Sequence, residues 1–221
     1  MTLAITCVIF DFDNTLVHSH IDFPAMKIAM AKVAKKAGID FGDEKKVPFK
    51  YTAGMMIEAA EKHDQENDTQ LTEKLWAIVE KYELEGMKNM EIENQTVDLL
   101  HQLKKSNFLL ALLTNNSRKA TLDALQRFNL FSFFAEIVAR EDVKKMKPDK
   151  EGLELILKRL SLKREETVFV GDSWVDGVAA KKAKIKFVLL RDSVSGFTDY
   201  PLEIWKHIQS IEELYPILDG Q

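Results

Sequence analysis

Beyond Asn94, segments with helical periodicity alternate with short apolar segments that are rich in β-branched and aromatic residues. The strand-like segments are 108–113, 137–139, 167–170 and 187–190, and a helical segment precedes each of them. Strands that alternate with helices are joined by right-handed crossovers and form a parallel sheet. The pattern therefore predicts an α/β fold, with a parallel sheet at its centre and helices on both faces.

The N-terminal segment 3–10 is apolar and partly β-branched, which is typical of a strand buried on both faces of a sheet. Two carboxylates, Asp11 and Asp13, follow where this strand should end. Carboxylates this close repel, and each raises the pKa of the other unless a cation lies between them or one stays protonated. The pair adds nothing to a stable core, and it indicates a metal-dependent active site.

Residues 17–90 interrupt the alternation of strands and helices and show only helical periodicity. Apolar spacing predicts helices over 25–37, 55–60 and 71–86, with Thr69 or Asp68 as the N-cap of the third. We therefore expect a Rossmann-like catalytic core formed by residues 1–16 and 91–221. Residues 17–90 are expected to form an inserted, all-helical cap domain.

Composition excludes several classes of protein. The 221 residues carry a net charge of −4 with dispersed Lys and Arg, so no basic stripe indicates nucleic-acid binding. The single cysteine, Cys7, rules out an internal disulfide and suits a reducing cytosol. The N-terminal apolar run is too short for a signal peptide, and no segment approaches transmembrane length. We expect a cytoplasmic monomer or homodimer that binds neither nucleic acid nor a membrane.

Polar residues follow the ends of three predicted strands. Ligands of an open parallel sheet bind beyond the carboxyl ends of its strands, so side chains distant in sequence are expected to meet there. The residues expected at this edge are Asp11, Asp13, Thr114, Asn115, Asp172 and Asp176, and Lys147 can reach it from the loop after 137–139.

The chemistry of these side chains points to a metal and a phosphate. The carboxylates offer hard oxygen ligands, with no His or Cys at metal-ligand spacing, and so favour Mg²⁺ over zinc. The turn after Thr114 opens a helix whose N-terminal amides suit an anion, and Lys147 adds positive charge. A divalent ion, a helix N-terminus and a lysine around a carboxylate are typical of phosphoryl transfer.

Four motifs resemble those of the haloacid dehalogenase superfamily, in its helical-cap subgroup with phosphoglycolate-phosphatase-like members. The motifs are Asp11-x-Asp13-x-Thr15, Thr114-Asn115, Lys147-Pro148-Asp149 and Gly171-Asp172-x-x-x-Asp176. They occur in the family's order, at the ends of predicted strands, and they span most of the chain. Their joint occurrence carries the resemblance.

The resemblance implies a Mg²⁺-dependent phosphatase that hydrolyses a small phosphorylated metabolite through an aspartyl-phosphate intermediate. Asp11 would be the nucleophile, and Asp13 would act as general acid and then as general base. The implied metal ligands are Asp11, the backbone carbonyl of Asp13, Asp172 and, directly or through water, Asp176. Thr114 and the Asn115 amide would bind the transferring oxygens, and Lys147 would neutralise charge between nucleophile and phosphoryl group.

Two further residues are candidates for substrate contact. His18 follows the first motif where the chain enters the cap, although it also fits a linker or surface histidine. Lys50 lies before the turn between the first two cap helices, a turn that influences specificity in related proteins. Residues 17–90 contain no arginine, so a cap arginine cannot recognise a substrate carboxylate.

Two other functions stay open at this point. A phosphomutase of the β-phosphoglucomutase type would use the same motifs with a long-lived phosphoaspartate. A non-catalytic binding module would keep the fold without turnover, and the intact motifs argue against it. A dehalogenase would share the nucleophile but would not use Asp13, Asp172 and Asp176 in this way, so these residues favour phosphate chemistry.

Overall fold

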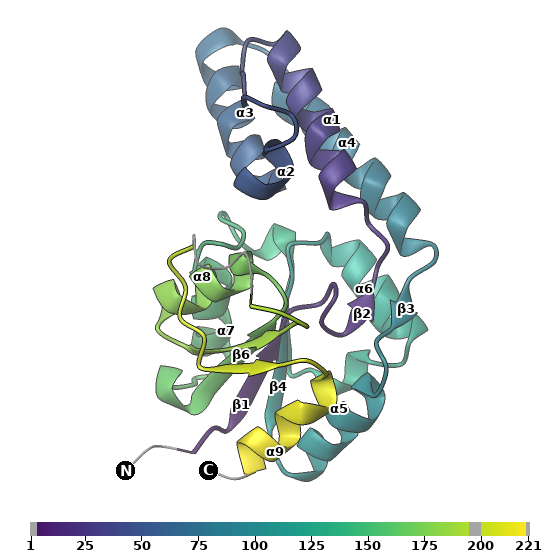
Figure 1. Cartoon of the computed structure of the whole chain (residues 1–221), viewed down its shortest axis with the longest axis vertical. Coiled ribbons are helices and arrows are strands. Elements are labelled where there is room, and N and C mark those ends of the chain that lie inside the picture. The colour runs from purple at the N-terminus through teal and green to yellow at the C-terminus, as the bar shows by residue number, and fades with distance from the viewer. Residues whose placement is uncertain (1–3, 195–199, 220–221) are drawn as a thin grey trace. The chain divides into compact units, whose positions relative to one another are not determined.

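The structure, a computed structural model, describes residues 4–194 and 200–219. Contacts within the chain divide it into two compact units, the first formed by Met1–His18 with Glu91–Gln221 and the second by Ser19–Met90 (Figure 1). The second unit is one continuous segment, whereas the first combines both ends of the sequence. The assignment of 17–90 as a cap over the core stays a prediction.

The first unit contains a sheet together with helices and short 3₁₀ turns. Its strands are β1 (Cys7–Phe10), β2 (Val17–His18), β3 (Glu91–Ile92), β4 (Leu109–Leu113), β5 (Glu136–Val138), β6 (Thr167–Gly171), β7 (Lys186–Leu190) and β8 (Lys206–Ile208). Its helices are α5 (Thr96–Lys105), α6 (Arg118–Arg127), α7 (Glu151–Arg159), α8 (Trp174–Ala183) and α9 (Leu214–Asp219). The 3₁₀ turns are Phe131–Phe133, Arg140–Asp142, Arg164–Glu166 and Ile211–Glu213.

Six strands form one parallel sheet in the order β5-β4-β1-β6-β7-β8. The predicted α/β fold with a Rossmann-like parallel sheet is confirmed. β1 lies in the interior of the sheet, with Cys7 opposite Leu109 on one side and Thr167 on the other. The strand is shorter than the predicted 3–10: it begins at Cys7, and residue 3 lies outside the described residues.

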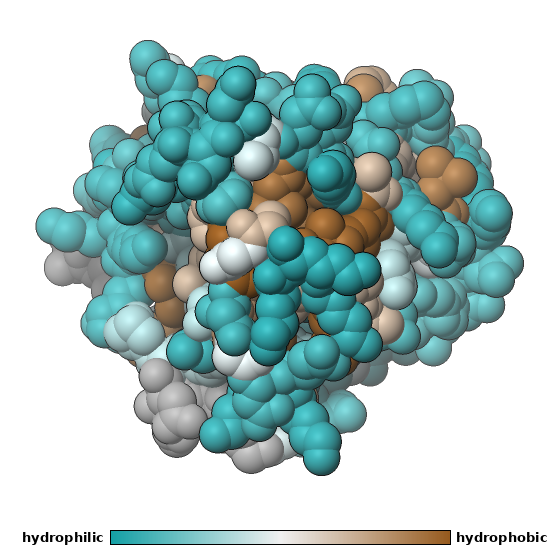
Figure 2. Space-filling model, turned by 90° about the horizontal axis from the view of Figure 1, so that it is seen from above, coloured by the Kyte–Doolittle hydropathy of each residue, from teal (hydrophilic) through white to brown (hydrophobic). Residues whose placement is uncertain are grey.

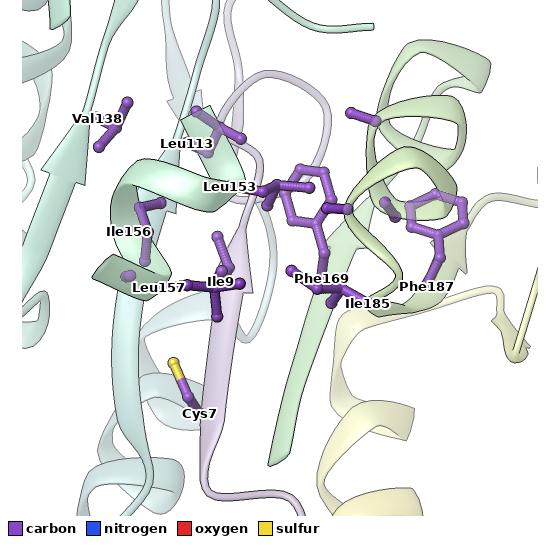
Figure 3. Close-up of a cluster of buried hydrophobic side chains, with 14 of the residues drawn as sticks. Cys7, Ile9, Leu113, Val138, Leu153, Ile156, Leu157, Phe169, Ile185 and Phe187 are labelled. Atoms are coloured by element: carbon purple, nitrogen blue, oxygen red, sulfur yellow. The ribbon is translucent and has the colours of Figure 1, made fainter. Parts of the chain in front are cut away.

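Helices cover both faces of this sheet. α7 and α8 pack on one face, and Figure 1 shows α5 and α9 on the other. Side chains of successive strand residues point to opposite faces, so Cys7 and Ile9 join the cluster under α7 and α8. Figure 3 shows this cluster, in which Phe169 and Phe187 are completely buried. Burial of each such side chain stabilises the fold by roughly 1.5–3 kcal/mol.

Three strands of the first unit were not predicted. β8 is an edge strand in which only Ile208 is buried, so its sequence lacks the apolar run of the interior strands. β2 and β3 form a two-residue antiparallel pair, with Val17 opposite Ile92. This pair lies at the points where the chain leaves and re-enters the first unit, and elements this short leave no periodicity to detect.

The second unit is built from four helices: α1 (Phe23–Lys36), α2 (Val47–Lys50), α3 (Ala53–Asn67) and α4 (Leu71–Met87). Apolar side chains at helical spacing form its core, with Met30, Met56 and Leu75 completely buried. Three of these helices occur where periodicity predicts them. The one-turn helix α2 was missed because four residues are too few to show a period.

The N-terminus of α4 is capped by a residue of the preceding helix. Asp64 accepts hydrogen bonds from the backbone N–H groups of Leu71 and Thr72, each at 2.8 Å. Desolvation raises the pKa of Asp64, but these bonds and one from the Thr69 hydroxyl outweigh it and hold the pKa well below its usual value. The expected N-cap, Thr69 or Asp68, was therefore wrong, because the acceptor comes from seven residues upstream of Leu71.

Figure 2 shows a face covered mostly by hydrophilic residues, with apolar residues gathered in its centre. Large apolar side chains with substantial exposure include Phe49 at 72% and Leu84 at 66%, both in the second unit. Within the described part of the chain, no helix combines the length and apolar character needed to cross a bilayer.

Candidate active site

The two carboxylates of the first motif lie at the carboxyl end of β1. The backbone N–H of Asp11 donates to the carbonyl oxygen of Val170 at 2.8 Å, so pairing with β6 continues one residue beyond the strand. The chain then turns, with Asn14 in the left-handed region at φ 56°, a conformation that Asn tolerates. Asp11 and Asp13 are both buried, at 7% and 8% exposure.

Lys147 connects the first motif to the fourth. Its ammonium group donates to Asp11, to Oδ1 of Asp176 at 2.7 Å and to the carbonyl oxygen of Leu113 at 3.2 Å. Desolvation lowers the pKa of Lys147, but the charges of Asp11 and Asp176 outweigh it and raise the pKa above its usual value. The lysine is therefore charged at neutral pH although it is 5% exposed.

Asn115 fixes the backbone of Lys147. Its side-chain Nδ2 donates to the carbonyl oxygen of Lys147, and the N–H of Lys147 donates to its Oδ1, both at 3.0 Å. This reciprocal pair joins the loop after β4 to the loop after β5. The expected role of Asn115 concerned its backbone amide, and its side chain makes a contact that the sequence did not indicate.

Asp172 and Asp176 follow β6 at the start of α8. Asp176 Oδ2 accepts hydrogen bonds from the N–H of Ser173 at 3.1 Å, which is one half of a capping box, and from the Ser173 hydroxyl at 2.5 Å. A Cβ atom on Gly171 would lie 2.7 Å from the Asp176 carboxyl carbon. Only glycine therefore lets the end of β6 approach this carboxylate.

Three carboxylates have the geometry of a metal site. Oxygens of Asp11, Asp172 and Asp176 all lie within 4.8 Å of one another. Burial, reinforced by the neighbouring acids, raises the pKa of Asp11 well above its usual value and that of Asp172 to about 7, although Lys147 opposes both shifts. One ammonium group does not balance three carboxylates, and an oxygen-only donor set fits Mg²⁺.

Asp13 lies beside this group and makes a different contact. Its carboxylate is not one of the three that approach one another, and its Oδ2 accepts a hydrogen bond from the side-chain amide of Asn116. The expected metal ligation through the backbone carbonyl of Asp13 stays a prediction. The sequence places Asn116 with Thr114 and Asn115 at the end of a predicted strand, but no role was predicted for it.

Thr114 and the start of α6 complete the polar edge. Thr114 is 2% exposed, and its Oγ1 accepts a hydrogen bond from the N–H of Asn116 at 3.1 Å. The hydroxyl hydrogen of Thr114 remains available as a donor to an anion. α6 begins at Arg118, with Ser117 as its N-cap.

The remaining candidates belong to other elements of the chain. His18 belongs to β2 and is exposed, and its Nδ1 lies 2.9 Å from Oδ1 of Asn14. Lys50 ends α2 in the other unit, where its ammonium group lies 5.0 Å from the centre of the Tyr51 ring. Their roles in substrate binding stay predictions. Trp174 stacks on Tyr200 with ring centres 4.3 Å apart, which is a packing contact.

The chain belongs to the haloacid dehalogenase-like hydrolases, since the sequence model of that family matches residues 8–190. It is 28% identical to the phosphoglycolate phosphatase of Vibrio cholerae over 81% of each chain. It is 36% identical to the pyrophosphatase PpaX of Halalkalibacterium halodurans, over 46% of each chain, so this match spans about half of that relative.

A solved structure of similar fold is a HAD-superfamily hydrolase of subfamily IA from Geobacter sulfurreducens, with a TM-score of 0.61 and 22% identity over 97% of this chain and 96% of that one. The predicted family and its phosphoglycolate-phosphatase-like subgroup are confirmed. The prediction of an enzyme that is a phosphoric monoester hydrolase is likewise confirmed by the family match and the named relatives.

Proposed function

We propose that this protein is a Mg²⁺-dependent phosphatase of small phosphorylated metabolites in the cytoplasm, acting through an aspartyl-phosphate. The observation that carries the proposal is the buried Lys147 ammonium group shared between Asp11 and Asp176. A carboxylate at a strand end that is held by a lysine, beside two more carboxylates, is suited to attack an anionic phosphoryl group.

In the proposed reaction, an oxygen of Asp11 attacks phosphorus while the bond from phosphorus to the leaving oxygen breaks. Asp13 gives a proton to that leaving oxygen. Asp13 then removes a proton from a water molecule, whose oxygen attacks phosphorus and releases Asp11 and inorganic phosphate. Asp11 thereby returns to the carboxylate and Asp13 to the protonated acid, which are the states in which they began.

The surrounding groups offset the negative charge of Asp11 and of the phosphoryl oxygens. Lys147 holds the attacking oxygen of Asp11 and reduces the repulsion between this carboxylate and the phosphoryl oxygens. The Thr114 hydroxyl and the backbone amide of Asn115, which precede the N-terminus of α6, are the proposed donors to those oxygens. Mg²⁺, held by Asp11, Asp172 and Asp176, supplies further charge neutralisation when bound.

The substrate class is supported by the names of relatives. Those names include a phosphoglycolate phosphatase, a pyrophosphatase and an N-acetylmuramic acid 6-phosphate phosphatase. The helical unit Ser19–Met90 is proposed to act as the cap that selects among such compounds, with Lys50 and with His18 of the first unit as candidate contacts. Its lack of arginine argues against recognition of a substrate carboxylate by a bidentate pair with the cap.

The proposal is tested by measuring phosphate release from a panel that includes phosphoglycolate, inorganic pyrophosphate and sugar phosphates, with Mg²⁺ or with EDTA. Asp11→Asn should abolish release, and Asp98→Asn, an exposed change on α5, serves as the matched control. Mass spectrometry of the rapidly quenched wild type should find one phosphoryl group on Asp11.

Other outcomes point to other functions. Phosphate release that survives Asp11→Asn contradicts the nucleophile. Interconversion of sugar-phosphate isomers without net phosphate release indicates a phosphomutase. Tight Mg²⁺ binding without turnover on the whole panel indicates a non-catalytic binding module.

A further inference from the structure

Asn116 is held at the candidate site by its own backbone. Its N–H donates to Oγ1 of Thr114 at 3.1 Å, and its carbonyl oxygen accepts from the N–H of Arg140 at 3.1 Å. The residue is 4% exposed, and its Nδ2 donates to Oδ2 of Asp13. A buried amide with a fixed backbone therefore presents its donor to one particular carboxylate.

The neighbouring asparagine serves a different group. Asn115 bonds the backbone of Lys147 through both side-chain atoms, and Lys147 in turn bonds Asp11. Two consecutive residues after β4 thus support the two carboxylates of the first motif separately. Asn115 supports Asp11 through Lys147, and Asn116 supports Asp13 directly.

We propose that Asn116 is a positioning residue for the proton transfer made by Asp13, an inference that rests on the proposed phosphatase function. A carboxylate beyond a strand end has two rotatable side-chain bonds, and transfer to the leaving oxygen requires a defined orientation. A hydrogen bond to a carboxylate is stronger than one between neutral groups and fixes that orientation. The amide of Asn116 adds no charge and takes up no proton at neutral pH.

The expected signature is a dependence on the leaving group. Proton donation matters most when the leaving oxygen is strongly basic, as in an alkyl phosphate, and least for p-nitrophenyl phosphate. We therefore expect Asn116→Ala to lower kcat/KM, which reports formation of the aspartyl-phosphate, by roughly 10²-fold for alkyl phosphates, within the range of general acid catalysis, and by only a few-fold for p-nitrophenyl phosphate. The slope of log kcat/KM against leaving-group pKa becomes steeper.

Two further variants separate positioning from packing. Asn116→Leu keeps the approximate size of the side chain but removes the N–H donor, and it should share the steeper slope. Asn115→Ala is the matched control, because loss of the Lys147 backbone contact affects attack on every substrate and should leave the slope unchanged. Mg²⁺ affinity measured by calorimetry should match that of the wild type for both Asn116 variants.

The outcomes distinguish this inference from the function on which it rests. Equal losses on alkyl and p-nitrophenyl phosphates in both Asn116 variants overturn the positioning role, provided that Asp13→Asn steepens the slope. If Asp13→Asn leaves the slope unchanged, the acid role of Asp13 and the inference fail together. A wild type without phosphate release overturns both proposals.

Discussion

The ammonium group of Lys147 lies 2.7 Å from Oδ1 of Asp176, and both side chains are at most 5% exposed. Asp176 is fixed at its other oxygen by Ser173, the N-cap of α8. Lys147 also bonds Asp11, so this one contact ties the end of β1 to the start of α8. The stability of the site and its chemistry therefore depend on the same side chains.

Replacing Lys147 by Met should abolish phosphate release and destabilise the fold. Removing one partner of a buried ion pair leaves uncompensated charge, at a cost of roughly 3–5 kcal/mol. Without the ammonium group the pKa of Asp11 rises further above its value in the unfolded chain, so the variant loses more stability as pH rises. Melting temperatures measured from pH 5 to 8 should diverge from the wild type toward high pH.

Added Mg²⁺ should restore part of the stability of Lys147→Met. Lys144→Met, a change at an exposed residue of the same loop, is the control. A difference in melting temperature that does not change with pH contradicts the assigned role of the lysine.

Metal-free protein should lose stability as pH rises from about 4 to 7. The pKa of Asp172 is about 7 in the fold, chiefly through burial and then through repulsion by Asp176. In the unfolded chain it is about 3.9, so the folded state holds an extra proton in this window. The free energy of unfolding without Mg²⁺, measured by urea titration, should fall across this window.

The same proton must leave when Mg²⁺ binds. Calorimetry at pH 6 in two buffers with different ionisation enthalpies should detect proton release on binding, and at pH 8 the release should be smaller. Apparent Mg²⁺ affinity should be weaker at pH 6 than at pH 8. Equal affinities at the two pH values would rule out this coupling.

Gly171→Ala should lower both the affinity for Mg²⁺ and the stability of the fold, with its main effect on the affinity. The new Cβ would lie 2.7 Å from the carboxyl carbon of Asp176, a buried group that Lys147 and Ser173 hold in place. The carboxylate has to move, which disturbs the metal site directly. Calorimetry measures the loss of affinity, and thermal unfolding measures the accompanying loss of stability.

Gly177→Ala is the matched control for this change. Its Cβ would approach Phe187 and Leu202 at 3.0 and 3.1 Å, two apolar side chains that are not part of the metal site. This variant should lose stability and keep its affinity for Mg²⁺. Loss of affinity in both variants to the same extent would contradict the specific role of Gly171.

Asp64→Asn should loosen the start of α4 at neutral pH. The substitution replaces one carboxylate oxygen, an acceptor for a backbone N–H group, by an amide nitrogen that cannot accept. Because the folded pKa of Asp64 lies below the unfolded value of about 3.9, its stabilisation is complete above that pH and disappears as pH falls through the folded value.

Hydrogen exchange at the amides of Leu71 and Thr72 should be faster in this variant than in the wild type. The difference should shrink at acid pH. Asp68→Asn is the control, since Asp68 occupies a left-handed position that Asn tolerates. Unchanged exchange at both amides would show that Asp64 does not hold the helix end.

The sequence predicts the framework of the first unit well because its interior strands carry strong signals. β4, β6 and β7 are apolar runs, and each is followed or flanked by residues typical of loops and helix ends. The rule that ligands lie beyond strand ends then predicts which polar residues meet. β8 was not predicted, because an edge strand with two exposed residues has no apolar period.

Contacts between loops are the part that the sequence does not reveal. The bonds from Asn115 to Lys147 and from Asn116 to Asp13 depend on how three loops approach one another in space. The cap of α4 is missed for a similar reason, because Asp64 reaches across the turn between two helices. Residue type indicates that such side chains seek partners, but it does not name the partner.

The position of β1 inside the sheet also affects the order in which the chain can fold. Cys7–Phe10 pairs with residues 109–112 and 167–170, so its neighbours are synthesised long after it. The intervening unit, Ser19–Met90, is continuous and needs no later segment for its own contacts. During translation β1, which Asp11 follows directly, stays unpaired until β4 and β6 have been synthesised, whereas the helical unit can complete its core earlier. The reactive centre therefore assembles only after β6 emerges.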